Sequence, residues 1–148
     1  MSFGMVFTAL HGYLNAKWFS EHGHHLNNEW FSDPRFLMGF IIYEFGYWVT
    51  IQSEYIMRNL RDPNDTKGPR YKIPRGGAFE YVSSPQYAAE LVAWTGFAIM
   101  TWGPGGLIVL TISMANLIPR AFKSHTWYQE KFGDEYPQNR KVIIPFIL

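Results

Sequence analysis

One short turn signal limits how this chain can fold more than any other feature. Gly103-Pro104-Gly105-Gly106 separates the apolar block Tyr87–Trp102 from the apolar block Leu107–Ile118. Three glycines and a proline within four residues strongly favour a turn. The two blocks are therefore predicted to form a helical hairpin, which returns the chain to the side from which it came.

Two more apolar blocks precede the hairpin, Phe3–Phe19 and Phe36–Met57. A membrane-spanning helix needs roughly 17–25 mostly apolar residues. Phe36–Met57 reaches that length, the third block does so if it begins near Val82, and the fourth does so if it begins at the glycines and continues past Pro119. The sequence is thus interpreted as an all-α, multi-span transmembrane bundle with about four membrane helices. A soluble all-helical domain is the alternative, because shorter apolar runs are typical of buried core helices.

The positive charges are concentrated in two stretches. Of 13 Lys and Arg, six lie in Arg58–Arg75 and five in Arg120–Lys141, whereas the connector Ser20–Asp33 contains none. A hairpin places both basic stretches on one membrane face, and an excess of Lys and Arg predicts that this face is cytosolic. The chain has no cysteine, which excludes disulfides, thiolate zinc sites and a cysteine nucleophile.

Three carboxylates, Glu44, Glu54 and Glu90, lie inside or at the edge of apolar blocks. A charge in a bilayer costs on the order of a few kcal/mol and usually faces a partner or a cavity. Glu90 is the most informative, because its apolar run contains no other charge. It is interpreted as a contact to a cofactor or an Arg, with a structural hydrogen bond between helices as the alternative.

The segment Arg58–Gly77 combines six cations with prolines and glycines. Guanidinium forks, ammonium charges and accessible backbone N–H groups are the means by which proteins hold phosphates. Attraction to anionic lipid headgroups is the alternative interpretation. The chain has neither a P-loop nor a GxGxxG motif, so a soluble Rossmann dinucleotide site is unsupported.

Two further groups of polar side chains are candidates. Arg120, His125 and Tyr128 lie within about three helical turns and could form a polar cluster, although Trp127 and Tyr128 could equally anchor the chain at the membrane interface. His22-Gly23-His24-His25 lacks the spacing and the carboxylate of a known metal motif. No metal and no nucleic-acid partner are expected.

Several stretches carry a resemblance to a known family. They are Asp33-Pro34-Arg35-Phe36, Arg58-Asn59-Leu60-Arg61, Tyr71–Gly77 with Phe79–Val82, Glu90 with Trp94 and Gly96-Phe97-Ala98, Asn116–Ala121, His125, Trp127-Tyr128, Lys131-Phe132-Gly133, Tyr136-Pro137 and Arg140–Phe146. From about Gly12 to Leu148 the chain resembles the steroid 5-alpha-reductases, or 3-oxo-5-alpha-steroid 4-dehydrogenases. Residues 1–148 are accordingly expected to form one C-terminal membrane domain of that family.

The resemblance implies a seven-helix membrane bundle that encloses NADPH. It implies cofactor contacts for Arg61, Tyr71, Glu90, Arg120 and Tyr128, and extends to Glu54, Lys72 and Gln86, where Gln86 stands in place of the usual Asn. With His125 from the polar cluster, the expected cofactor-binding set is Glu54, Arg61, Tyr71, Lys72, Gln86, Glu90, Arg120, His125 and Tyr128. Thr50, Gln52 and Ala93 depart from the family pattern.

The implied reaction is the NADPH-dependent reduction of a conjugated C=C bond in a lipid, from a 3-oxo-delta-4 steroid to a 5-alpha-steroid. Hydride reaches the beta carbon of the enone while hydrogen-bond donors stabilise its carbonyl oxygen. Family members are longer at the N-terminus, and the acid and tyrosine for that role are expected there. No catalytic residue is assigned here, and the isolated chain is expected to be inactive. Membrane lipids and the endoplasmic reticulum are its expected surroundings.

Three alternatives stay open. Val82-Ser83-Ser84-Pro85 and Gly96–Thr101 are similar to the very-long-chain trans-2-enoyl-CoA reductases. Isoprenylcysteine-type membrane methyltransferases share a hairpin bundle and a similar tail, and would bind S-adenosylmethionine instead of NADPH. The third alternative is an inactive truncated paralogue.

Overall fold

The chain folds into helices only. The structure is a computed structural model that describes residues 2–60 and 71–148. Its elements in chain order are α1 (Ser2–His22), η1 (Gly23–His25), η2 (Asn28–Ser32), α2 (Pro34–Asn59), η3 (Gly77–Glu80), α3 (Pro85–Thr101), α4 (Pro104–Phe132) and η4 (Gly133–Glu135), where η marks a 3-10 helix. The described residues contain no β-strand, and a single parallel bridge joins Val82 to Lys141. The all-α prediction is confirmed.

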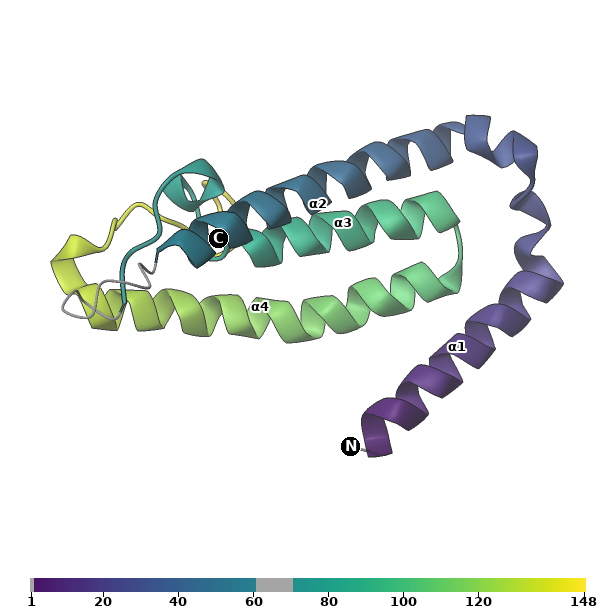
Figure 1. Ribbon diagram of the computed structural model, residues 1–148, viewed down its shortest axis with the longest axis horizontal. Helices are drawn as coiled ribbons and strands as arrows, with labels where there is room; N and C mark the ends of the chain where they lie inside the picture. The colour runs from purple at the N-terminus through teal and green to yellow at the C-terminus, as the bar shows by residue number, and fades with distance from the viewer. Residues whose placement is uncertain (1, 61–70) are drawn as a thin grey trace.

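Helices α2, α3 and α4 run side by side, whereas α1 leaves the bundle at an angle (Figure 1). Helix α1 approaches the bundle through its C-terminal half, where the Trp18 ring lies beside Gly103 at the start of α4. The connections from α1 to α2 and from α3 to α4 lie at one end of the bundle. The loop before α3 and the C-terminal tail lie at the other end (Figure 1).

The predicted hairpin is present. Helix α3 stops at Thr101 because Trp102 adopts a left-handed conformation with φ of 46°, and Pro104 occupies the first turn of α4, where proline's fixed φ is favourable. Helix α4 begins at this turn and continues through Pro119 to Phe132, as a membrane span of full length requires. Helix α3 begins at Pro85, not near Val82, and has 17 residues.

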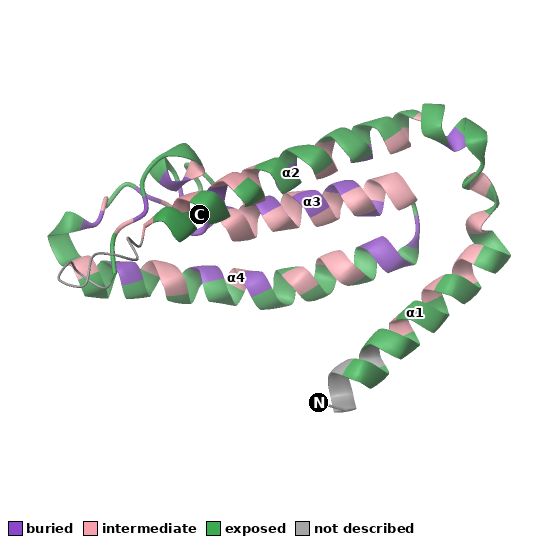
Figure 2. Cartoon of the chain, in the orientation of Figure 1, coloured by how far each residue is buried: buried purple, intermediate pink, exposed green. Residues whose placement is uncertain are grey.

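One helical stretch among the described residues, Pro104–Glu135, is long and apolar enough to cross a membrane. For α1, α2 and α3 the membrane span remains a prediction. Helix α2 has 26 residues, yet its buried residues are only Gly39, Gly46 and Ser53, spaced seven apart. Figure 2 shows that much of the rest of α2 is exposed. This exposed surface carries large apolar side chains: Leu37, Met38, Phe40, Ile41, Phe45, Tyr47, Trp48, Ile51 and Tyr55.

Small residues allow α2 and α3 to lie close together. A Cβ on Gly46 would stand 2.5 Å from the backbone nitrogen of Ala93 and 2.6 Å from the carbonyl oxygen of Ala89. A Cβ on Gly96 would likewise meet the α2 backbone at Gly39 and Tyr43. Glycine and alanine let helix backbones approach closely, which is how helices commonly associate in membranes.

The C-terminal tail, residues 136–148, packs back onto the bundle. Ala121 is fully buried on α4 and packs with Val142 and Ile143 of the tail. Backbone hydrogen bonds from Ser83 N to Lys141 O (2.8 Å) and from Lys141 N to Tyr81 O (2.9 Å) join the tail to the loop before α3. This folding-back brings α3, α4 and the tail together at one end of the molecule.

The opposite end is held by a cation between two tryptophans. The Arg35 guanidinium lies 4.6 Å from the centroid of the Trp30 ring and 4.9 Å from that of Trp102. It also donates two hydrogen bonds of 2.9 Å to the Asp33 carboxylate, while Trp30 Nε1 donates to Met100 O at 2.9 Å. The start of α2 is thereby attached to the α3–α4 turn.

Candidate functional site

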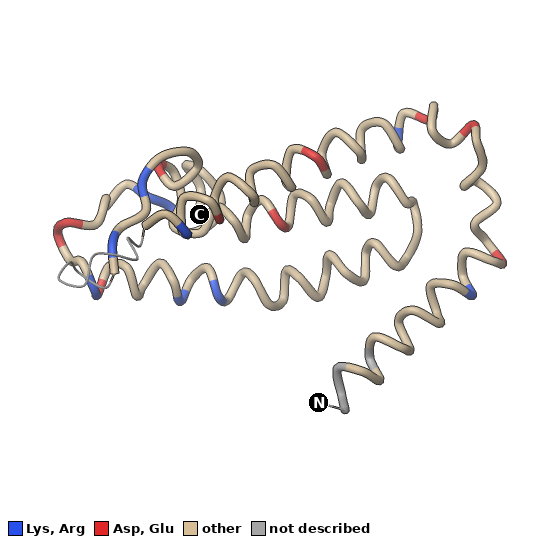
Figure 3. Tube along the Cα trace, in the orientation of Figure 1, with Lys and Arg blue, Asp and Glu red and all other residues tan. Residues whose placement is uncertain are grey.

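The described cations of both basic stretches gather toward the end of the bundle that holds the tail (Figure 3). Lys17 lies on α1 and Arg35 at the start of α2. The first stretch contributes Arg58, Lys72 and Arg75, and the second contributes Arg120, Lys123, Lys131, Arg140 and Lys141. The hairpin brings these stretches together, because it returns α4 to the level at which α3 began. This is the arrangement that the sequence predicted.

A buried hydroxyl connects three segments at this end. Ser83 Oγ lies 2.5 Å from His125 Nδ1 on α4, 2.6 Å from the Tyr136 hydroxyl and 3.1 Å from the Lys141 carbonyl oxygen. Ser83 and Tyr136 are each only 1% exposed. His125, one of the expected cofactor-binding residues, is therefore held by the loop before α3 and by the tail. We call these four residues the Ser83 node.

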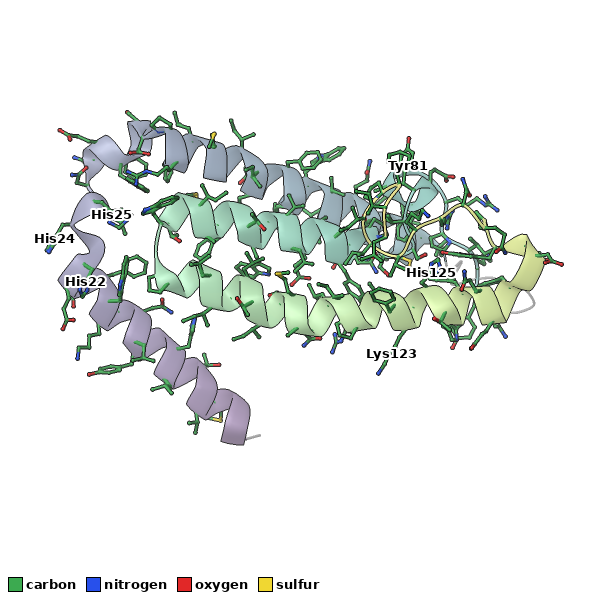
Figure 4. The ribbon with its side chains drawn as sticks, turned by 180° about the vertical axis from the view of Figure 1, so that it is seen from behind. His22, His24, His25, Tyr81, Lys123 and His125 are labelled. Carbon is green, nitrogen blue, oxygen red and sulfur yellow. The ribbon has the colours of Figure 1, made fainter. Side chains whose placement is uncertain are left out.

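Aromatic rings continue from the node along α4. Tyr128 and Tyr136 stack with ring centroids 5.4 Å apart and planes inclined by 7°. Trp127 contacts Tyr128 on one side and, at 5.2 Å, the Tyr71 ring in an edge-on arrangement. Two expected cofactor-binding tyrosines, Tyr71 and Tyr128, thus lie near each other and near His125. Figure 4 shows His125 facing the tail region and Lys123 pointing away from the bundle.

Arg140 is the most unusual residue of the site. It is 2% exposed, and Nε, Nη1 and Nη2 of its guanidinium have no hydrogen-bond partner among the residues that the structure describes. The guanidinium carbon lies 5.4 Å from the centroid of the Tyr136 ring. A buried charge is normally paired, because leaving it unpaired costs several kcal/mol in solvation. A guanidinium fork of this kind can bind an anion such as a phosphate or carboxylate.

Two more polar groups are buried without a partner in the described part of the chain, Ser84 Oγ and Gln86 Oε1. Both residues lie at the start of α3. Gln86 belongs to the expected cofactor-binding set, and its free amide oxygen can accept a hydrogen bond. Glu90, one turn further along α3, accepts a 3.3 Å hydrogen bond from Trp94 Nε1. This bond lies within α3, so it is not a bond between helices, and it leaves the second carboxylate oxygen of Glu90 for another partner.

Three described members of the expected set are not joined to this cluster. Glu54, Lys72 and Arg120 are exposed, and Arg61 lies outside the described residues. Glu44, the other carboxylate noted from the sequence, lies on α2. The structure therefore brings together Tyr71, His125 and Tyr128, places Gln86 and Glu90 on the neighbouring helix, and leaves Glu54, Lys72 and Arg120 at the surface.

The side chains of the histidine-rich connector point in different directions (Figure 4). Within the described residues, no three His, Asp or Glu side chains are grouped closely enough to hold an ion. His25 lies against Trp30 with ring centroids 4.7 Å apart, and its Nε2 is 3.3 Å from Thr101 O. His22 stacks on Trp18, and His24 points away from the bundle (Figure 4).

Three residues of the site, Ser83, Tyr136 and Arg140, were assigned no role from the sequence. Arg140 is one cation of a basic stretch, and its burial depends on how the tail folds back. Ser83 is one of two adjacent serines, and only the structure distinguishes them. The available signal was the Tyr136-Pro137 and Arg140-Lys141 motif of the tail, which supported the family resemblance without indicating a function.

An apolar cleft of about 360 Å³ lies between α3, α4 and the tail. Its lining includes Leu91, Met114, Ile118 and Ile143. Sites for small molecules commonly fall between about 300 and 1,000 Å³ and are mostly apolar. The cleft could therefore accept a lipid or part of one.

Known proteins resemble this chain over nearly its whole length. The family model described as 3-oxo-5-alpha-steroid 4-dehydrogenase matches residues 1–148. The chain is 44% identical over 143 residues to 3-oxo-5-alpha-steroid 4-dehydrogenase 1 of Mus musculus, covering 97% of the chain and 54% of that protein. It is 40% identical over 142 residues to steroid 5-alpha-reductase DET2 of Solanum lycopersicum, covering 96% and 53% respectively.

A cotton relative, steroid 5-alpha-reductase DET2 of Gossypium hirsutum, is 44% identical over 147 residues, which are 99% of the chain and 55% of that protein. The chain thus spans about half the length of the curated relatives it matches. Because the family match extends over every residue from Met1 to Leu148, the chain belongs to the 3-oxo-5-alpha-steroid 4-dehydrogenase, or steroid 5-alpha-reductase, family.

Proposed function

We propose that this chain is the cofactor-binding part of a membrane reductase that uses NADPH to reduce the conjugated C=C bond of a 3-oxo-delta-4 steroid. The observation that carries the proposal is the family match over residues 1–148, together with relatives named as steroid 5-alpha-reductases at 40–44% identity. Those names favour a steroid over an enoyl-CoA substrate. The match also favours a reductase over a methyltransferase.

The polar groups of the site fit a phosphorylated dinucleotide. The buried Arg140 guanidinium, which has no hydrogen-bond partner in the described part of the chain, provides donors in the fork geometry that suits phosphate oxygens. Gln86 Oε1, which likewise has no partner among the described residues, can accept from an amide or hydroxyl group of the ligand. His125 and Tyr128 add two groups that can each donate or accept a hydrogen bond. When bound, NADPH supplies the hydride that reduces the substrate.

The residues of this chain therefore bind and orient. Arg140 would hold a phosphate group out of water, and the Ser83 node would keep His125 in one orientation. The carboxylic acid and tyrosine that activate the steroid carbonyl are expected in the additional N-terminal spans of full-length family members. The cleft lined by Leu91 and Ile118 offers an apolar surface for the lipid. We place the protein in the endoplasmic reticulum membrane, with the basic end in the cytosol.

Nucleotide binding tests this proposal. The purified chain in detergent micelles is titrated with NADPH, NADH and S-adenosylmethionine while the intrinsic tryptophan fluorescence is recorded. Saturable quenching by NADPH is expected, with weaker quenching by NADH, which lacks the 2′-phosphate. A folded, monodisperse sample that binds only S-adenosylmethionine, or none of the three, contradicts the proposal.

Turnover is measured separately by following NADPH absorbance with a 3-oxo-delta-4 steroid. The chain alone is expected to bind NADPH without oxidising it, whereas membranes that contain a full-length relative oxidise it. Steroid turnover by the 148-residue chain alone would show that the expected N-terminal acid and tyrosine are not needed. Binding without turnover separates a cofactor-binding part from an inactive paralogue that has lost the cofactor site.

A further inference from the structure

The Ser83 hydroxyl has three neighbours and only one proton. His125 Nδ1, the Tyr136 hydroxyl and the Lys141 carbonyl oxygen all lie within hydrogen-bonding distance, at 2.5, 2.6 and 3.1 Å. A serine hydroxyl can donate one hydrogen bond and accept two. All three contacts can therefore be hydrogen bonds at once only if Ser83 donates to one neighbour and accepts from the other two.

The carbonyl decides which neighbour receives the proton. A carbonyl oxygen can only accept, so Ser83 must donate to Lys141 O, which also accepts the Ser83 backbone N–H at 2.8 Å. A carbonyl oxygen has two lone pairs and can accept both bonds. The Tyr136 hydroxyl and His125 Nδ1 must then both donate to Ser83. The proton of neutral His125 consequently lies on Nδ1, because the hydrogen bond made by one ring nitrogen sets the tautomer.

We infer that Ser83 is a positioning residue that holds neutral His125 as the Nδ1–H tautomer, so that Nε2 offers its lone pair to an O–H or N–H group of the bound cofactor. No described side chain hydrogen-bonds to Nε2 of His125, and the ring is half-buried. The ligand end of this inference rests on the proposed NADPH function. The tautomer does not, because it follows from protein atoms alone.

The location of the node supports a role in positioning. Ser83 precedes α3, His125 lies on α4 and Tyr136 lies in the tail. The backbone around the buried Ser83 side chain is fixed by the hydrogen bonds from Ser83 N to Lys141 O and from Lys141 N to Tyr81 O. Tyr136 also stacks on Tyr128, another expected cofactor contact. One serine thus sets the ring orientation of His125 and contacts the tyrosine that packs against Tyr128.

The test is ¹⁵N NMR of histidine-labelled protein in micelles, with the His125 signals assigned from their loss in His125→Gln. Without cofactor, Nδ1 of His125 is expected to carry the proton and Nε2 to be unprotonated at neutral pH. In Ser83→Ala the fraction of His125 in the Nδ1–H tautomer is expected to fall. Tyr136→Phe is expected to keep it, because Ser83 can still donate to the carbonyl and accept from His125.

The control is Ser53→Ala, which removes another serine hydroxyl that is 1% exposed but bonds only to Val49 O of its own helix. It should leave the His125 signals unchanged, and the other four histidines report whether each variant folds. An Nε2–H tautomer in the unmodified protein overturns the inference. So does an unchanged tautomer in a folded Ser83→Ala variant.

Saturating NADPH should then shift the Nε2 resonance of His125 in the unmodified protein, and Ser83→Ala should bind NADPH roughly three- to tenfold more weakly, the value of one hydrogen bond. If fluorescence shows that NADPH is bound but the Nε2 resonance of His125 is unchanged, Nε2 is not an acceptor for the cofactor. The tautomer assignment is not affected by that result. If fluorescence shows no binding, the proposed function fails, and the tautomer result is still decided by the cofactor-free spectra.

Discussion

At Arg140, the stability of the unliganded protein and the binding of an anionic ligand are expected to oppose each other. Its guanidinium is buried, lies near the Tyr136 ring and has no hydrogen-bond partner among the described residues. Such a group lowers the stability of the protein without a ligand, because its lost hydration is not replaced. An anionic ligand restores the missing interactions. Stability and binding should therefore respond to its removal in opposite directions.

Replacement of Arg140 by methionine tests this. Methionine fills a similar length without charge, so the unliganded protein should gain about 1–3 kcal/mol in its free energy of unfolding. Loss of charge-assisted hydrogen bonds, worth about 1.5–3 kcal/mol, should weaken NADPH binding by roughly 10- to 150-fold. Chemical unfolding measures the first effect, and fluorescence titration measures the second.

Lys123→Met is the matched control for Arg140→Met. Lys123 is exposed and points away from the bundle (Figure 4), so its removal should change neither quantity much. If Arg140→Met destabilises the unliganded protein and binds NADPH normally, Arg140 has a structural partner and is not an anion-binding group.

At the far end, Asp33 and Arg35 form an ion pair. Hydrogen bonds from the Arg35 side chain and backbone hold the pKa of Asp33 at about 2, below its ordinary value of 3.8. Because the pKa is lower in the folded state, the stabilisation is present above pH 3.8 and is lost as the pH falls toward 2. Arg35→Gln should raise the Asp33 pKa toward 3.8, as measured by ¹³C carboxyl NMR.

The control for this pair is Lys17→Gln. Lys17 forms an exposed 4.0 Å pair with Glu21, so its loss should not alter the Asp33 titration. An Asp33 pKa that stays near 2 in Arg35→Gln would mean that the Arg35 side chain is not its cause.

At the scale of elements, the packing of α2 against α3 depends on glycine and other small residues at their interface. Helix α2 buries only Gly39, Gly46 and Ser53, and the opposing surface of α3 is formed by residues as small as Ala93 and Gly96. The close approach leaves no room for a larger residue at the crossing points. Packing at this interface is therefore backbone against backbone, and a single methyl group should disturb it.

Gly46→Ala should lower the free energy of unfolding by about 1–3 kcal/mol, the usual cost of overpacking. The new Cβ would lie 2.5 Å from Ala93 N, a backbone atom that cannot move aside by changing a rotamer. Chemical unfolding monitored by circular dichroism measures the change in micelles.

Gly12→Ala is the matched control for Gly46→Ala, because Gly12 lies within α1 and its Cβ would meet nothing within 4 Å. Alanine is the better helix former, so this variant should be neutral or more stable by up to about 1 kcal/mol. Equal effects at both positions would show that helix propensity, not the α2–α3 contact, is responsible.

At the scale of the whole molecule, the two ends differ in charge and in chemistry. One end gathers the described cations of both basic stretches (Figure 3), and the Ser83 node lies there as well. The other end holds the histidine-rich connector, the Arg35 guanidinium between Trp30 and Trp102, and the α3–α4 turn. The proposed cytosolic orientation of the basic end rests on this difference in charge.

The absence of cysteine allows a direct test of this orientation. Single cysteines replace two exposed residues, Asp134 at the basic end and His24 at the other. In sealed microsomes with the cytosolic face outward, a membrane-impermeant maleimide should label Asp134→Cys at once and His24→Cys only after permeabilisation. The reverse pattern, or labelling of both without permeabilisation, would contradict the proposed topology.

Local features of the sequence were enough to predict the helices, the hairpin and the family. Proline at the start of α3 and α4, the glycines of the turn and the length of each apolar block act over neighbouring residues, so each can be read from a short segment. The length of α4 followed from the same argument, since a helix that crosses Pro119 was required for a span. Motifs spread over the chain were sufficient for the family.

The candidate site required the folded chain. Ser83 lies 42 residues from His125, 53 from Tyr136 and 58 from Lys141, so no local pattern could join them. The burial of Arg140 likewise depends on the tail folding back over α3 and α4. The position of the proton on the His125 ring is inferred from the three contacts of Ser83 Oγ, which only the folded chain creates. Residue types and helix positions are local properties, whereas partners, burial and tautomer arise from contacts between distant segments.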